Sequence, residues 1–177
     1  GYLHIAISRL AWLDAPVIAA VNGAAAGAGL SLAACCDLVI ASDTAKFTSA
    51  YTRIGLTPDG SSTYFLTRVI GRRRALELYL TNRTITAQEA LDWGLVNRVV
   101  PSADLNKEVD QLAKDIAAGP TLAHGGVKRL VLMSPNDTLE SQMERETREI
   151  TRMVGTEDAQ NGIAAFVGKQ KPIFEGR

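Results

Sequence analysis

The chain has 177 residues, with 19 basic and 19 acidic side chains and therefore no formal net charge. This length allows one domain with a sizeable core, and the neutral balance excludes a general attraction to nucleic acid or to an anionic membrane. No apolar run is long enough to span a bilayer and no signal peptide is evident, so we expect a cytoplasmic, reducing compartment. Cys35 and Cys36 are adjacent in an apolar run, which favours reduced core thiols.

The first elements lead to a loop of small residues. Apolar side chains at helical spacing predict a helix over residues 3–13, and residues 17–21 form a β-branched run typical of a buried strand. Small residues follow over 22–29, and a short buried helix is expected over 30–36. A helix N-terminus after such a loop offers backbone N–H groups and a favourable dipole to a phosphate or to an oxyanion.

Two other interpretations of the loop stay open. Small residues also let a helix and a strand pack closely, without any ligand. The glycines at 27 and 29 resemble part of a dinucleotide fingerprint, but Leu32 occupies the position of its third glycine.

Further elements follow in order. Strands are expected over 37–41, 46–48 and 95–100, and helices up to residue 70, over 72–80 and over 86–93. Pro58-Asp59-Gly60 is a strong turn signal, after which Ser61 or Ser62 could cap a helix. Thr86 and Glu89 form a capping box. Helical periodicity then continues from residue 105, with breaks near 119, 134 and 155, as far as residue 168.

The loop sequence A-V-N-G-A-A-A-G-A-G over 20–29, followed by Cys36-Asp37, resembles the signature of the crotonase (enoyl-CoA hydratase/isomerase) superfamily. Further similar segments extend the resemblance over essentially the whole chain, at 45–47, 54–56, 66–71, 90–96 and 166–174. It implies an α/β fold, a spiral of β-β-α turns with a C-terminal helical trimerisation region. Residues 1–100 would be the C-terminal part of the spiral core and 101–177 the helical oligomerisation region. A front portion of the fold, with the other oxyanion donor and part of the adenine site, is expected to precede Gly1.

The resemblance also implies site residues. The N–H of Ala28 would be one donor of an oxyanion hole for the thioester carbonyl of an acyl-CoA. The two glutamates of the hydratases align with Ser31 and Tyr51, so two-glutamate hydration is not expected. Asp59 aligns with the aspartate that moves a proton in epoxyphenylacetyl-CoA and enoyl-CoA isomerases. The same position in 4-chlorobenzoyl-CoA dehalogenases attacks the chlorinated ring carbon. The turn signal alone would also explain Asp59.

Three functions are weighed on this basis. Proton-transfer isomerisation comes first. Hydrolytic dehalogenation comes second, and in that group Tyr51 aligns with the aromatic partner of the nucleophile and His4 with the histidine that activates water. On an otherwise apolar helix, His4 could equally be a structural or surface residue. The third is a non-catalytic acyl-CoA-binding homologue.

The remaining predictions concern coenzyme A and assembly. Phe166 and Lys169 resemble an F-x-x-K ending that reaches the CoA of a neighbouring subunit, and the loop residue Ala26 would also contact CoA. The spacing predicts that Phe166 and Lys169 share one helix face. Phe166 could instead only dock the last helix on the core. We expect a homotrimer or a hexamer, a CoA thioester as substrate, no separate cofactor, and no metal site, because no residue cluster has metal-ligand spacing.

Overall fold

The computed structural model describes all 177 residues and divides into two compact units, which we describe separately. Unit 1 comprises Gly1–Ala11 and Val17–Asp110, and unit 2 comprises Trp12–Pro16 and Gln111–Arg177. None of the helices combines the length and the apolar character that crossing a bilayer requires. The roles assigned above to residues 1–100 and 101–177 stay a prediction.

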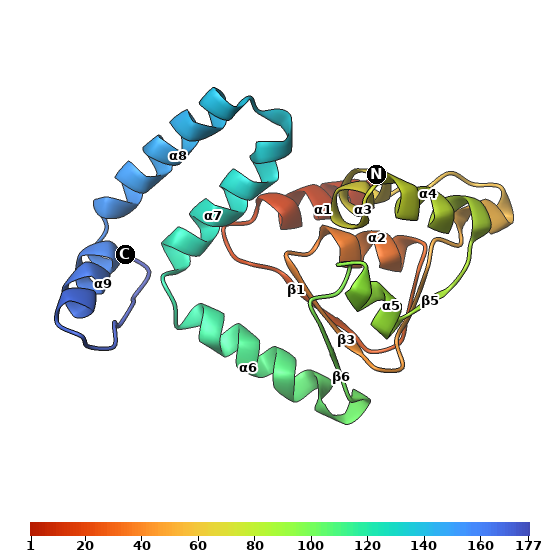
Figure 1. The fold of residues 1–177 in the computed structure, drawn as a ribbon, viewed down its shortest axis with the longest axis horizontal. Helices are drawn as coiled ribbons and strands as arrows, with labels where there is room; N and C mark the ends of the chain where they lie inside the picture. Colours follow the sequence, from red (N-terminus) through yellow and green to blue (C-terminus); the bar gives the residue numbers. More distant parts are fainter. The chain divides into compact units, whose positions relative to one another are not determined.

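Unit 1 alternates short strands with helices (Figure 1). Its first elements are helix α1 Tyr2–Trp12, strands β1 Ile18–Val21 and β2 Ala24–Ala26, helix α2 Ala28–Cys35, strands β3 Leu38–Ser42 and β4 Lys46–Thr48, and the 3₁₀ turn η1 Tyr51–Ile54. They are followed by helices α3 Ser62–Ile70 and α4 Arg72–Thr81, strand β5 Ile85–Thr86, helix α5 Ala87–Asp92, strand β6 Arg98–Val100, the 3₁₀ turn η2 Ser102–Asp104 and the start of helix α6 Leu105–Ala117.

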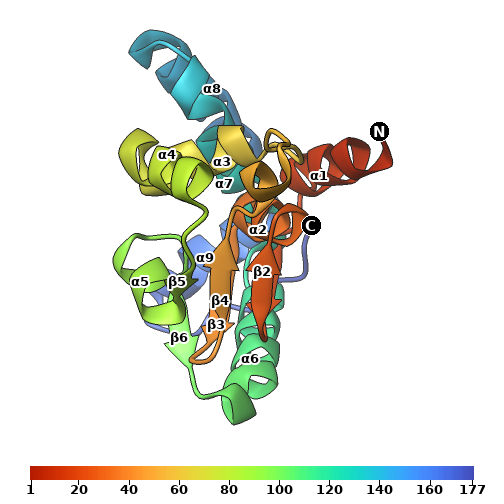
Figure 2. The same ribbon diagram turned by 90° about the vertical axis from the view of Figure 1, so that its right-hand side faces the viewer.

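The strands form two three-stranded sheets. One has the order β1-β3-β6 and is parallel, with Ile18 opposite Leu38. The other has the order β2-β4-β5, in which β2 and β4 are parallel neighbours and β5 is antiparallel (Figure 2). The segment β1-β2-α2 is repeated by β3, β4 and the helices after them, so each turn of the chain adds one strand to each sheet. This arrangement is the predicted spiral of β-β-α turns.

The core of unit 1 joins these sheets to helices α2 to α5. Its fully buried members come from different elements and include Leu30 of α2, Phe47 of β4, Leu66 of α3, Leu78 of α4 and Ile85 of β5. Burying such side chains is the main favourable term in folding. Because α2, α3 and α4 each contribute to this one cluster, their ends are held at fixed positions relative to one another.

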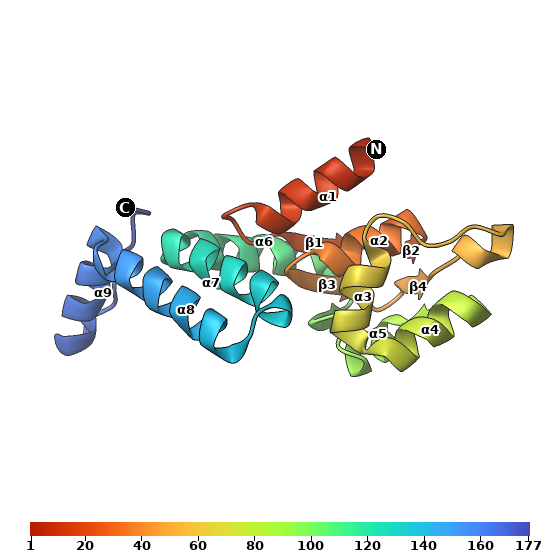
Figure 3. The same ribbon diagram turned by 90° about the horizontal axis from the view of Figure 1, so that it is seen from above.

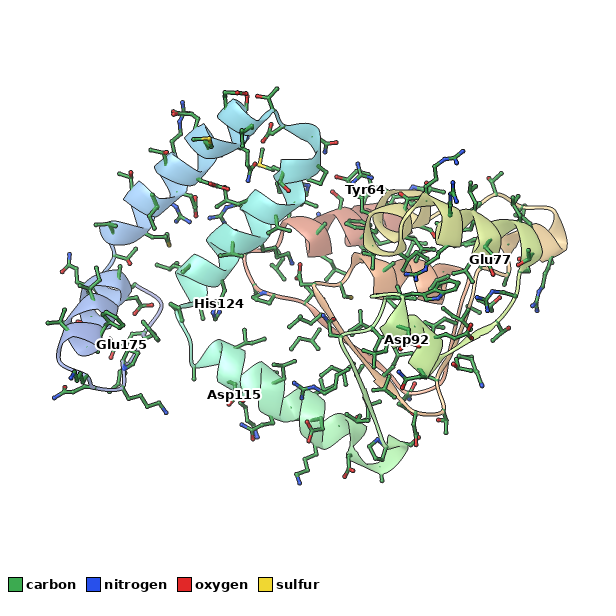
Figure 4. The ribbon with its side chains drawn as sticks, in the orientation of Figure 1. Tyr64, Glu77, Asp92, Asp115, His124 and Glu175 are labelled. Carbon is green, nitrogen blue, oxygen red and sulfur yellow. The ribbon has the colours of Figure 1, made fainter.

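Unit 2 is helical, with helix α7 Thr121–Met133, the 3₁₀ turn η3 Ser134–Asn136, and helices α8 Leu139–Val154 and α9 Glu157–Val167. Helices α7 and α8 lie side by side (Figure 3), and Arg129 of α7 forms an ion pair with Glu149 of α8 at 2.8 Å. The buried carboxylate of Asp158 accepts hydrogen bonds from the N–H groups of Glu175 and Gly176, which holds the C-terminal tail beside α9 (Figure 4).

Several expectations about local structure were wrong. The loop over 22–29 contains strand β2, and β5 was not predicted, because both pairings depend on β4, which is distant in sequence. The expected strand over 95–100 begins only at Arg98, since the N–H groups of Leu95 and Val96 donate to Ala90 and close helix α5. The capping box at Thr86 and Glu89 is confirmed.

Candidate functional site

Helix α2 begins directly after the glycine loop. Gly27 has a φ of 53°, and its N–H donates to the carbonyl of Thr48 at 3.2 Å, which ties the loop to β4. Ala28 is the first residue of α2, is exposed, and follows a position that provides no side-chain cap. The first N–H groups of an α-helix have no acceptor within the helix. The N–H of Ala28 therefore has no acceptor within the helix, and an oxyanion could accept from it.

A buried hydroxyl one turn further along α2 links three segments. The side chain of Ser31 is fully buried, and its Oγ lies 3.2 Å from the carbonyl of Gly27, 3.2 Å from Tyr51 OH and 3.1 Å from the carbonyl of Asp59. A serine hydroxyl has a single proton, so these contacts compete for one donor. Ser31 thus joins α2 to η1 and to the turn that carries Asp59.

The carboxylate of Asp59 is held by Tyr51. Tyr51 OH donates to Asp59 Oδ1 at 2.7 Å, and the structure records no hydrogen bond to Oδ2. The side chain of Asp59 is exposed and that of Tyr51 is half-buried. The hydrogen bond to a charged acceptor is of the stronger kind and fixes the direction of the carboxylate. One carboxylate oxygen is therefore anchored while the other stays available to a reacting group.

The environment keeps Tyr51 in its protonated form. Burial raises the pKa of the Tyr51 hydroxyl above its usual value of about 10, and the hydrogen bond and negative charge of Asp59 add to the increase. The hydrogen bond with Ser31 acts in the opposite direction. Because the pKa stays above the usual value, Tyr51 is a hydrogen-bond donor to Asp59 at neutral pH and not a general base.

His4 lies beside the same turn. Its Nε2 accepts a hydrogen bond from the N–H of Gly60 at 3.2 Å, so the proton of the neutral ring is assigned to Nδ1. The neighbouring Ile7 of α1 is buried and directs this face of the helix to the turn. The structure therefore places His4 at the turn that carries Asp59, and the lone pair of Nε2 is already used by Gly60.

Gly60 fits tightly against two helices. Its φ is 61°, and a Cβ built there would lie 3.1 Å from Cβ of Ser31 and 3.3 Å from Cδ1 of Ile7. Both the left-handed conformation and the lack of space require glycine at this position. The turn that presents Asp59 is thus packed directly against α1 and α2.

Sequence reasoning missed part of the support of this site. Ser61 precedes α3 but forms no side-chain cap, and its φ is 60°. The hydroxyl of Ser62 instead lies 2.8 Å from Tyr79 OH of α4, and both side chains are buried. Tyr79 lies in α4, whose sequence pattern predicts only a helix, and nothing in that pattern indicates that Tyr79 contacts Ser62.

Of the residues predicted to contact coenzyme A, Ala26 directly precedes Gly27 of the glycine loop, and Phe166 and Lys169 lie far from this cluster in the chain. Ala26 ends β2 opposite Thr48 of unit 1, whereas Phe166 and Lys169 belong to unit 2. The expectation that Phe166 and Lys169 share one helix face was wrong, because α9 ends at Val167 and Lys169 adopts a left-handed conformation with φ 52°. Phe166 is exposed. No group of three or more His, Cys, Asp or Glu residues could hold a metal ion.

The comparisons with known proteins all indicate the same family. The sequence model described as "Enoyl-CoA hydratase/isomerase" matches residues 4–177. A 4-chlorobenzoyl coenzyme A dehalogenase of Arthrobacter sp. is 41% identical over 169 residues, which are 96% of this chain and 61% of the relative. The 1,2-epoxyphenylacetyl-CoA isomerase of Escherichia coli K12 is 41% identical over 172 residues, which are 97% of this chain and 65% of the relative. The chain thus spans less than two thirds of the length of these curated relatives.

A solved structure agrees with this result. The crystal structure of an enoyl-CoA hydratase from Polaromonas sp. JS666 has a TM-score of 0.94 at 38% sequence identity, and the match covers 98% of this chain and 67% of that one. The predicted α/β fold of the crotonase type is confirmed.

The packing of Gly60 can be tested by comparing two glycines in the left-handed region. Gly55 has a φ of 74° with open space around it, so Gly55→Ala should lower the free energy of unfolding by about 1–2 kcal/mol, the conformational cost alone. Gly60→Ala should cost about 1–3 kcal/mol more, because the new methyl group is forced against Ser31 and Ile7. Urea unfolding of both variants measures the difference. Equal losses would contradict the tight packing of this turn.

Proposed function

The chain belongs to the enoyl-CoA hydratase/isomerase family, and from this membership we propose that it is an acyl-CoA isomerase in which Asp59 moves a proton along the acyl chain. The observation that carries the proposal is the 2.7 Å hydrogen bond from Tyr51 to Asp59 Oδ1. Through Ser31, the same assembly is joined to the first turn of α2, where the N–H of Ala28 lies. A base and an oxyanion donor are thus parts of one hydrogen-bonded unit.

In the proposed reaction these groups act on the substrate as follows. Asp59 Oδ2 takes a proton from the carbon between the thioester and the double bond of a 3-enoyl-CoA. The electron pair moves onto the thioester oxygen, where the N–H of Ala28 stabilises the enolate. The protonated Asp59 returns the proton to the far carbon of the former double bond, and a 2-enoyl-CoA results. Tyr51 keeps the carboxylate oriented through both steps.

Two-glutamate hydration fits the site poorly. The two positions that would supply carboxylates hold Ser31, which is fully buried, and Tyr51, which stays protonated. Neither group can take a proton from water at neutral pH without a stronger base beside it. Asp59 is the one carboxylate in this hydrogen-bonded cluster, which favours a reaction with one acid–base group.

Hydrolytic dehalogenation of an aryl-CoA is the second candidate. It is favoured by the position of His4 beside the Asp59 turn and by the similarity to a dehalogenase. In that reaction Asp59 would displace chloride, and a base would then activate the water that cleaves the aryl ester. His4 Nε2 accepts from Gly60 and would have to leave that hydrogen bond to act as the base. We therefore rank isomerisation first.

Replacement of Asp59 tests the reaction. Asp59→Asn keeps the size of the side chain but removes its basicity, so isomerisation of 3-enoyl-CoA should fall by about 10²–10⁴-fold. Asp59 is exposed and can exchange the proton that it holds with solvent, so in deuterated water the parent protein should place label at the carbon that Asp59 protonates. His4→Gln is the matched control and should retain isomerisation. Unchanged activity of Asp59→Asn would overturn the role of Asp59. Chloride release from 4-chlorobenzoyl-CoA, lost in both variants, would instead establish dehalogenation, and binding of acyl-CoA without any turnover would indicate a binding protein.

The donor role of Ala28 can be tested at the backbone. Ala28 is the first residue of α2, a position where proline is tolerated because its missing N–H has no helical partner. Ala28→Pro should leave the helix in place and reduce kcat by about 10²–10³-fold, the usual effect of losing one oxyanion donor. Ala28→Gly retains the N–H and should remain active. Circular dichroism checks the helix content of both variants. An active proline variant would exclude the N–H of Ala28 as a donor.

We also propose that unit 2 contributes to coenzyme A binding in a homotrimer or a hexamer of two trimers. Apolar side chains of α8 that are exposed in the single chain support such an assembly: Leu139, Met143, Ile150 and Val154. Phe166 and Lys169 are exposed at the end of α9, where an aromatic ring and a mobile positive charge could meet the adenine and a phosphate of CoA. The CoA that they meet would be that of a neighbouring subunit, where it would also contact Ala26 of that subunit. A cytoplasmic location stays a prediction.

Salt dependence tests the role of Lys169. Lys169→Ala should weaken CoA thioester binding more at low salt than at high salt, because the attraction between exposed charges is screened. Lys171→Ala removes a nearby exposed charge from the same tail and should have little effect. Calorimetry at two salt concentrations measures binding, and analytical ultracentrifugation checks that assembly is unchanged. Binding as tight as that of the parent at low salt, or a monomeric parent, would show that the proposal is wrong.

A further inference from the structure

The hydroxyl groups of Ser62 and Tyr79 form a buried pair that is connected to the Tyr51–Asp59 contact. Ser62 Oγ at the start of α3 lies 2.8 Å from Tyr79 OH of α4, and the two residues are 1% and 6% exposed. A buried hydroxyl without a partner is costly, whereas the pair satisfies both groups. Burial raises the pKa of the Tyr79 hydroxyl above its usual value, so the pair stays uncharged at neutral pH.

The pair is connected to both residues of the proposed site. The N–H of Ser62 donates to the carbonyl of Asp59 at 3.1 Å, which links Tyr79 to the Asp59 turn. Thr52 Oγ1, next to Tyr51, donates to the carbonyl of Tyr79 at 2.6 Å. Tyr79 therefore holds the Asp59 turn through its side chain and the Tyr51 segment through its main chain.

The Tyr51 segment and the Asp59 turn each contain a residue whose backbone conformation is unfavourable by itself. Ala50, directly before Tyr51, and Ser61, two residues after Asp59, have φ values of 58° and 60°, in the left-handed region that non-glycine residues rarely adopt. Such residues persist when the surrounding structure determines them. Ser61 forms no side-chain cap at α3, so the Ser62–Tyr79 contact is the side-chain hydrogen bond that anchors the start of this helix.

We propose that Tyr79 is a positioning residue, which sets the distance between Tyr51 OH and the Asp59 carboxylate by holding both segments against α4. Its effect on rate rests on the isomerisation proposed above, but its effect on the Tyr51–Asp59 contact does not. Tyr79 itself touches neither carboxylate nor substrate. Without its hydroxyl the Asp59 turn loses an anchor, and the hydrogen bond from Tyr51 becomes longer or is lost.

The test measures the ionisation of Tyr51 in the full chain without any ligand. Tyrosine labelled with ¹³C at Cζ is titrated by NMR, and Tyr51→Phe assigns the signal. Ser31 of α2 and Asp59 are the groups that hydrogen-bond to this hydroxyl. In Tyr79→Phe the pKa of Tyr51 should fall toward its usual value, because the contribution of Asp59 is reduced while burial remains. The negative charge of an ionised Tyr51 raises the pKa of Tyr79, so Tyr79 is still neutral while Tyr51 titrates. Removal of Tyr79 OH therefore takes no charge away from the surroundings of Tyr51.

Kinetics provide the second measurement. With 3-enoyl-CoA, kcat of Tyr79→Phe should fall by about threefold to tenfold, the effect expected from losing one buried hydrogen bond, with KM nearly unchanged. Ser62→Ala should behave alike, and the double variant should be no worse than either single variant, since both remove the same contact. Ser42→Ala is the matched control, because it removes a fully buried hydroxyl that bonds only to Asp43, Thr44 and Ser102. It should change stability without moving the pKa of Tyr51 or kcat.

The outcomes separate the two proposals. An unchanged Tyr51 titration in both Tyr79→Phe and Ser62→Ala overturns the positioning role, whatever the activity. A lowered Tyr51 pKa together with a parent protein that isomerises no 3-enoyl-CoA supports the positioning role and rejects the proposed function. Additive losses in the double variant, or the same shift in Ser42→Ala, would show general destabilisation and also overturn the role of Tyr79.

Discussion

The contact between the Asp59 turn and helix α2 is the constraint on which the rest of the site depends. It consists of the Ser31 hydroxyl on one side and the main chain of Asp59 and Gly60 on the other. A side chain at residue 60 would be forced against Ser31 of α2 and Ile7 of α1. If the turn moved, Asp59 would lose both its hydrogen bond from Tyr51 and its fixed relation to the first turn of α2. The N–H of Ala28 and the carboxylate of Asp59 would then no longer belong to one rigid unit.

This polar contact is held by an apolar core. Leu30 and Ser31 are consecutive residues of α2, and both are fully buried, so the helix that carries the buried hydroxyl is fixed by the main hydrophobic cluster. Leu66 and Leu78 fix α3 and α4 in the same cluster. Hydrogen bonds in a region with little water are directional and costly to leave unmade. The core therefore stabilises the arrangement of the helices. The hydroxyl groups of Ser31, Tyr51, Ser62 and Tyr79 fix the orientation of the polar groups in the site.

The chemistry of the site follows from how its protons are distributed. Burial, partial for Tyr51 and nearly complete for Tyr79, raises the pKa of both hydroxyl groups, so both are donors at neutral pH. Tyr51 directs its proton to Asp59, and the N–H of Gly60 directs its own to His4. Asp59 Oδ2 is left as the carboxylate oxygen without a hydrogen bond. A site of this kind suits a reaction in which one carboxylate both accepts and returns a proton.

The sequence by itself determined the helices and the family. The periodicity of α7 and α8 and the capping box of α5 each depend on residues only a few positions apart. The glycine-loop signature, together with the other segments that resemble the family, indicated the crotonase fold before any contact was known. It also placed Asp59 in a turn, because Pro58-Asp59-Gly60 is a local signal. Only the tertiary structure decided what that turn faces. The contacts of Asp59 with Ser31, of Gly60 with His4 and of Ser62 with Tyr79 join residues 28, 56 and 17 positions apart. The short strands β2 and β5 likewise depend on pairing with β4. Such contacts form because the core brings helices from different turns of the spiral together, and no pattern of neighbouring residues contains that information.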